Sequence, residues 1–114
     1  MIPMQGLRRA ACLFGFLIIA ACTPQAQRSS VHFVPDAMGL AVPEAGQRID
    51  FGRSPEGVIA ALDREVGSGR ELPLVGCPES VARQIDWQGL VLSFSRERFI
   101  GWRSGNQQAG QTCF

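Results

Sequence analysis

A short apolar run near the start of the chain limits which part of the sequence can fold as a domain. It extends over 12 residues from Ala10 to Ala21, behind Arg8 and Arg9 and ahead of a polar segment. A helix needs about 20 apolar residues to cross a bilayer, so the run fits the core of a signal peptide. Residues 1–21 are therefore predicted to be a signal peptide, whose removal would leave 93 of the 114 residues. An uncleaved anchor is the alternative, and the abrupt polar flank argues against it.

The end of this run carries a second signal. Residues 19–22 read IAAC, which resembles the bacterial lipobox, an aliphatic residue and two small residues before a cysteine. The resemblance implies a bacterial lipoprotein that is cut before Cys22 and held at the membrane by lipid on this cysteine. Thr23 follows it in place of aspartate, which by the same resemblance favours the outer membrane, facing the periplasm. Residues 22–30 would form a flexible tether and residues 31–114 a single small domain.

Cys77 and Cys113 are the two cysteines that remain in the predicted domain. So small a domain buries only about 60% of its unfolded surface, so a covalent staple would help it. Two cysteines in an exported domain favour a disulfide, which would close a loop of about 36 residues and contribute about 4 kcal/mol in the chain-entropy model. The alternatives are two buried thiols, or a nucleophile at Cys77 with His32, the only histidine, as its base.

Charge and motifs narrow the possible functions. The chain has 11 basic residues, all arginine, and 10 acidic ones, and loss of Arg8 and Arg9 would leave a net charge of −1. A nearly neutral domain lacks the positive field that holds nucleic acid, so no nucleic-acid partner is expected. The sequence has no catalytic motif, and one histidine cannot build a metal site. We therefore expect neither an enzyme, nor a cofactor, nor a metal.

The clearest local pattern predicts a helix from Pro55 to about Val66. Ser54 is a suitable N-cap, proline suits the first helical position, and Gly67 is suited to the end. Val58, Ile59, Leu62 and Val66 would form its apolar face. Before the helix, the sequence predicts a short strand at residues 31–34, a loop at residues 36–47 and a strand at residues 48–51.

Alternation after residue 83 predicts three antiparallel strands, at residues 84–87, 90–95 and 98–103. Gln88 and Gly89 would form the first turn, and residues 104–111 would be a polar tail. The apolar face of this meander needs a cover, which the helix at residues 55–66 can supply. The predicted fold is therefore α+β, with one helix packed on a small antiparallel sheet and a disulfide.

One stretch of the meander combines aromatic and arginine side chains, which are enriched at binding hot spots. On one interpretation these residues form a contact patch; on the other, which strand alternation favours, the rings fill the core and the arginines are solvated. The candidate patch consists of Arg96, Arg98, Phe99, Trp102 and Arg103.

The predicted order of elements gives two weak family comparisons. The strand, the Phe51-Gly52-x-Ser54 helix start and the helix to Val66 resemble small outer-membrane lipoproteins of the BamE (SmpA/OmlA) type over residues 49–66. That resemblance implies a structural or assembly-supporting role through contacts with an envelope protein. The chain is also similar to periplasmic lysozyme-inhibitor lipoproteins, which are small, disulfide-tied and nearly all β, so the helix counts against them. A binding or inhibitor module for an envelope enzyme or small ligand is thus the alternative, and a protruding loop or deep pocket would favour it.

Overall fold

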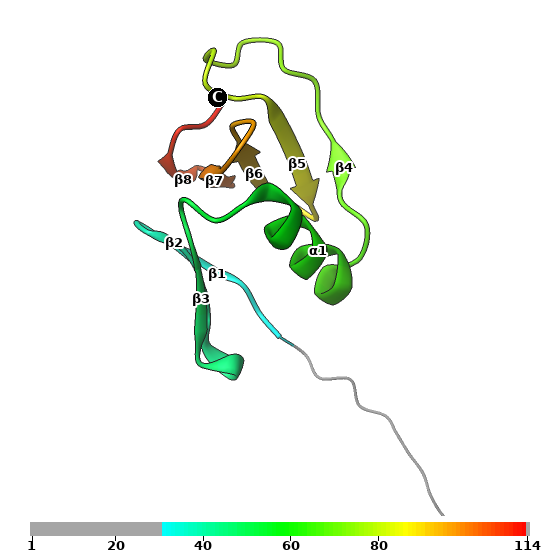
Figure 1. The fold of residues 1–114 in the computed structure, drawn as a ribbon, viewed down its shortest axis with the longest axis vertical. Helices are drawn as coiled ribbons and strands as arrows, with labels where there is room; N and C mark the ends of the chain where they lie inside the picture. Colours follow the sequence, from blue (N-terminus) through cyan, green and yellow to red (C-terminus); the bar gives the residue numbers. More distant parts are fainter. Residues whose placement is uncertain (1–30, 114) are drawn as a thin grey trace, which may run out of the picture. The chain divides into compact units, whose positions relative to one another are not determined.

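The computed structural model describes residues 31–113, which form one α-helix and two antiparallel sheets (Figure 1). The predictions for the signal peptide, the tether and Cys22 lie outside these residues. The predicted α+β class with a disulfide is confirmed, with a second sheet that was not expected. In chain order the elements are β1 (Val34–Asp36), β2 (Gly39–Val42), the 3₁₀ helix η1 (Pro43–Ala45), β3 (Gln47–Asp50), α1 (Pro55–Val66), β4 (Arg70–Glu71), β5 (Arg83–Trp87), β6 (Leu90–Phe94), β7 (Phe99–Ser104) and β8 (Gln107–Gly110).

Helix α1 has the predicted bounds, Pro55–Val66. Ser54 precedes it in an extended conformation, but its side chain makes no capping hydrogen bond; instead its carbonyl accepts from the Val58 N–H at 3.2 Å. Gly67 follows the last turn with φ +112, where a side chain would be strained. The helix buries Val58 and Leu62, which confirms the predicted apolar face at its two central positions.

The five-stranded sheet has the order β4-β5-β6-β7-β8, so every strand pairs with its neighbours in sequence. Strands β5, β6 and β7 confirm the predicted meander. Gln88 and Gly89, both with positive φ, make the turn between β5 and β6. The prediction of a polar tail at residues 104–111 is wrong, because β8 pairs with β7 there. An edge strand needs no buried face of its own, so its polar residues carry no alternation signal.

The three-stranded sheet has the order β1-β2-β3 and replaces most of the predicted loop. The predicted strand at residues 31–34 in fact begins at Val34, and residues 39–42 form β2. Gly39 misled the prediction, because glycine usually marks a loop. Here it has φ +140, and a Cβ on it would lie 2.5 Å from the Ile49 carbonyl oxygen. Glycine therefore permits the close approach of β2 to β3.

The core brings together α1, β2 and the inner face of the five-stranded sheet. Backbone bonds from the Gly52 N–H to the Phe99 oxygen and from the Phe99 N–H to the Arg53 oxygen, each 2.8 Å, join the segment after β3 to β7. The rings of Phe51 and Phe99 meet edge-on at 5.0 Å. The main buried cluster consists of Leu40, Val58, Leu62, Ile85, Trp87, Leu92, Phe94, Phe99 and Trp102.

The two aromatic rings of the candidate contact patch are buried. Phe99 is 0% and Trp102 4% exposed, so both rings belong to the core and cannot meet a partner. Arg96 and Arg98 are exposed in the turn before β7, while the Arg103 Nε donates to the Cys113 carbonyl at 3.1 Å. The rings therefore lie where strand alternation places them, in the core.

Candidate functional site

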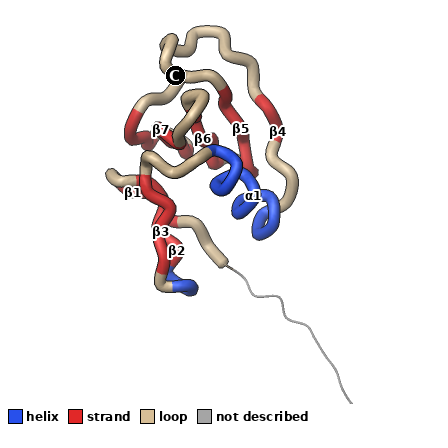
Figure 2. The backbone as a smooth tube through the Cα atoms, in the orientation of Figure 1, coloured by secondary structure: helices blue, strands red, loops and turns tan. Residues whose placement is uncertain are grey.

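The predicted disulfide joins Cys77 to Cys113, whose Cα atoms lie 4.4 Å apart. It connects the long segment between β4 and β5 to the residues that follow β8 (Figures 1 and 2). Because the Cys77 sulfur is bonded, the interpretation of Cys77 as a nucleophile is not supported. His32, its suggested base, instead contacts Glu44, with 2.7 Å between Nδ1 and Oε2.

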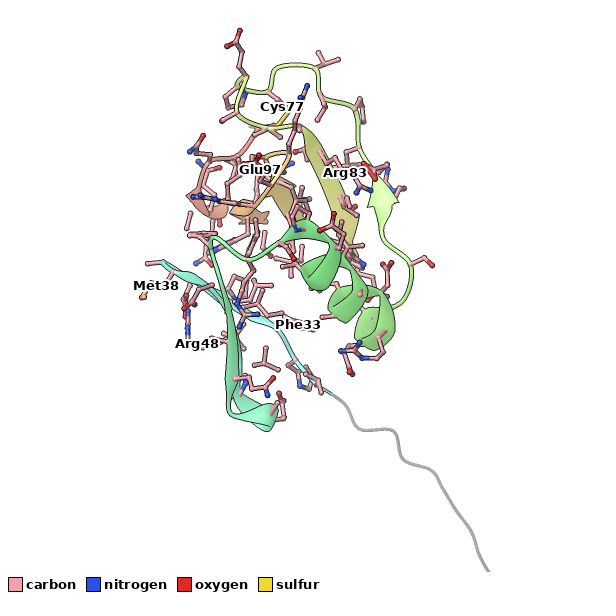
Figure 3. The ribbon with its side chains drawn as sticks, viewed as in Figure 1. Phe33, Met38, Arg48, Cys77, Arg83 and Glu97 are labelled. Atoms are coloured by element: carbon pink, nitrogen blue, oxygen red, sulfur yellow. A yellow bond between two sulfur atoms is a disulfide. The ribbon has the colours of Figure 1, made fainter. Side chains whose placement is uncertain are left out.

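The segment Leu72–Glu79, called the pinned loop below, is fixed along its backbone. The Leu72 N–H donates to the Gln84 carbonyl at 2.8 Å, and the Gln84 Nε2 donates to the Pro73 carbonyl at 3.0 Å. Gln84 is 5% exposed, so a buried side chain on β5 holds the start of the loop. The disulfide holds its other end, at Cys77. The loop is therefore restrained at both ends, and it extends beyond the strands at the top of Figure 3, where Cys77 is labelled.

A tight turn forms the tip of the pinned loop. The Cys77 N–H donates to the Leu74 carbonyl at 3.1 Å, and Gly76 has φ +80, as the third position of a type II turn requires. The side chain of Val75 is 91% exposed at this tip, and that of Leu74 is 42% exposed. An apolar surface on a restrained backbone is a feature of interaction sites, because little freedom remains to be lost on binding.

Sequence reasoning missed these two residues because it assigned no role to the apolar side chains between Pro73 and Pro78. The missed signal is local. Two apolar residues between a proline and a glycine have no strand or helix that could turn them toward a core.

A shallow hollow of about 390 Å³ lies beside the turn. Gln108 and Thr112 form its far side, and the Thr112 Oγ1 donates to the Gln108 Oε1 at 3.3 Å. Ser80, just after the pinned loop, contacts the Gln111 side-chain oxygen through its hydroxyl. Loop, disulfide and final residues thus form one continuous surface. Its hollow is lined by Gly76, Cys77, Pro78, Gln108 and Thr112.

The charged groups at the base of the pinned loop are paired. Arg83 and Glu71 lie 2.6 Å apart across β5 and β4, and the hydrogen bonds that the Arg83 guanidinium donates to Glu71 raise the pKa of Arg83. Arg70 and Asp86 form a second pair at 2.9 Å. These ion pairs hold the short β4 against β5, which leaves the apolar tip as the distinctive part of this surface.

The acidic side chains at the base of the pinned loop and His32 are held in separate ion pairs. Glu71 and Asp86 pair with separate arginines, and His32 pairs with Glu44. Among residues 31–113, no group of three or more His, Cys, Asp or Glu side chains is placed to hold a metal ion.

A second concave region lies between α1 and β3. It consists of two small cavities of about 210 and 110 Å³, which share Gln47, Ile49 and Ala61. Sites for small molecules usually enclose about 300–1,000 Å³. Each cavity by itself is below this range, so neither alone would enclose such a ligand.

No protein-family model matches the chain, and comparison with curated proteins and with solved structures found no match. Within the described part of the chain, no helix has the length and apolar character needed to span a bilayer. Function must therefore be inferred from the chain's own residues.

Proposed function

We propose that this chain is a lipid-anchored binding protein of the bacterial cell envelope that contacts a protein partner through the pinned loop. One observation carries the proposal: Val75 is 91% exposed on a turn restrained by a disulfide and by hydrogen bonds. Leu74, which is 42% exposed, lies next to Val75 on the same turn, so the turn presents two neighbouring apolar residues to solvent, as interaction sites do.

Two roles use a surface of this kind. In the first, the domain is a binding or inhibitor module that occupies a site on one envelope enzyme. In the second, it supports the assembly of a larger complex. The protruding loop favours the first role, because a restrained convex turn fits a concave site better than a flat surface. The size of the partner complex distinguishes them, since assembly support requires co-purification with several subunits.

The membrane anchor rests on residues 19–22 and their resemblance to the lipobox. Lipid on Cys22 would hold the domain at the outer membrane, facing the periplasm. Confinement near the membrane raises the effective concentration of a binding domain for a partner in the same membrane. Cys22→Ser should block processing and release the protein from membranes. Intact mass would test this, because the parent protein should match residues 22–114 plus lipid.

Photo-crosslinking in the source bacterium tests the binding role. Benzoylphenylalanine placed at Leu74 in the full chain should give a protein adduct. The matched control places benzoylphenylalanine at Val34, an apolar residue on β1 that is 47% exposed. Adducts from Leu74 and none from Val34 would support the proposal. Equal labelling from both positions, or no protein adduct from Leu74, would contradict it.

A further inference from the structure

The mode of binding can be inferred from the groups that the pinned loop presents. The edge of β4 offers little to a partner strand. Leu72 directs its N–H toward β5, so Glu71 must direct its backbone groups outward, because these groups alternate along an antiparallel strand. Pro73, the next outward position, has no N–H, and its carbonyl accepts from Gln84. Strand addition needs several free backbone groups in a row, so it does not fit this edge.

The tip, in contrast, presents side chains on a turn that is closed by the hydrogen bond from the Cys77 N–H to the Leu74 carbonyl. Val75 is β-branched and has few rotamers, so fixing it in a pocket costs little entropy. With 91% of its surface exposed, it has nearly its whole apolar area to bury on binding. Its burial in a pocket would remove this apolar surface from water, which is favourable.

The charge of the loop favours a protein over a lipid surface as the occupant. Residues 72–79 read LPLVGCPE, so Glu79 is the only charged residue and the segment has no lysine, arginine or tryptophan. Segments that insert into the membrane interface usually carry basic residues, which anionic lipids attract, and aromatic residues, which insert at the headgroup boundary. A single acidic residue instead complements a basic group at the rim of a protein pocket.

We propose that Val75 enters an apolar pocket of the protein partner, with Glu79 facing a basic group at the rim of that pocket. This inference rests on the proposed function and specifies the partner's surface. The hollow beside the turn, lined by Gln108 and Thr112, would then lie against the rim of the interface. A reporter at Gln108 can therefore follow binding without altering the anchor.

The test places benzoylphenylalanine at Gln108 in the full, lipid-anchored chain and measures the yield of protein adduct in the source bacterium. Val75→Ile keeps an apolar anchor and should retain the adduct. Val75→Asp should lower the yield about tenfold or more, since burial of a valine is worth about a factor of ten in affinity. Val75→Thr, which keeps the shape and adds a hydroxyl, should lower it several-fold. Val34→Asp is the matched control and should leave the yield unchanged.

The outcomes separate this inference from the proposed function. An adduct that persists in Val75→Asp would overturn the role of Val75 as an anchor and leave a protein-binding function standing. Labelled lipid in place of protein would overturn the choice of a protein pocket. No protein adduct from either Leu74 or Gln108 in the parent chain would overturn the proposed function itself. Because Val75 is exposed, each Val75 variant should keep the disulfide and the unfolding midpoint of the parent protein. Measuring both checks that the variant is folded.

Discussion

The Trp102 indole N–H donates a hydrogen bond to the Asp36 backbone carbonyl at 2.7 Å, across 66 residues of sequence. The bond connects β7 of the large sheet to the end of β1 in the small sheet. Trp102 is 4% exposed, so the bond forms away from bulk water. The small sheet is thus held in place by a specific polar contact as well as by apolar packing.

Trp102→Phe should lower the free energy of unfolding by about 1–3 kcal/mol, because the Asp36 carbonyl would lose its partner near the core. Urea unfolding followed by circular dichroism would measure the change. A variant with the same urea midpoint as the parent protein would show that the bond makes no net contribution to the free energy of unfolding.

Removal of the disulfide should affect both stability and the pinned loop. Replacement of Cys77 and Cys113 by alanine should cost about 4 kcal/mol in the chain-entropy model. It should also make the loop a site of proteolysis, because its exposed tip would lose one of its restraints. Thermal unfolding and digestion with an elastase-type protease, which cuts after small apolar residues such as Val75, would measure the two effects. Equal resistance of the variant and the parent would mean that the hydrogen bonds alone fix the loop.

Two glycines should respond to alanine in opposite directions. A Cβ on Gly101 would overlap the backbone of Gln111, so Gly101→Ala should displace the final residues and cost about 1–3 kcal/mol. A Cβ on Gly57 would meet only the Ser54 Oγ, at 3.5 Å. Gly57→Ala in α1 should therefore stabilise the protein by about 0.5–1 kcal/mol. Thermal unfolding of both variants gives the comparison, and destabilisation by both would contradict it.

Acid should weaken the small sheet. Hydrogen bonds from Arg48, at 2.8 and 2.9 Å, and from the Met38 N–H lower the pKa of Asp36 from 3.8 to about 2. A carboxylate whose pKa is lowered on folding stabilises the protein above its unfolded pKa, and this contribution is lost as the pH falls from about 4 to 2. Asp36→Asn should therefore be less stable than the parent at pH 6 and approach it at pH 2. Unfolding midpoints across this range would test it, and a constant difference would contradict the assignment.

Glu44 allows an independent version of the same experiment. Hydrogen bonds from the His32 backbone N–H and ring lower the pKa of Glu44 from 4.5 to about 2. Glu44→Gln should therefore be less stable than the parent at pH 6, and the difference should shrink as the pH falls from about 4.5 to 2. The effect should be confined to the contact between residue 32 and η1, which amide hydrogen exchange of this segment can report. Uniform exchange changes throughout both sheets would contradict a local role.

The parts of the fold that were predicted correctly have strong local signals. Pro55 and Gly67 mark the two ends of α1, and the pair Gln88-Gly89 adopts the positive φ angles that join β5 to β6. Each signal acts within a few residues, so the sequence alone suffices to read it.

The parts that were missed depend on contacts distant in sequence. Gly39 lies in a strand because the Ile49 carbonyl comes close to it, which no local rule reveals. One local signal was available: the Asp36 Oδ1 accepts from the Met38 N–H at 3.0 Å, an Asx turn at the start of a hairpin. At the candidate site, the disulfide was predictable from cysteine count, and the turn that exposes Val75 had a local signal, the two apolar residues between Pro73 and Gly76.

The backbone bonds between Phe99 and residues 52–53 also bear on the order of folding. The hairpins from β5 to β8 close over short turns, whereas these bonds and the one from Trp102 to Asp36 must close long loops of chain. The meander can therefore form first, and the small sheet can pack against it only after β7 is in place. Trp102→Phe should then speed unfolding while leaving the rate of refolding nearly unchanged. The contacts between the two sheets would thus set the lifetime of the native state.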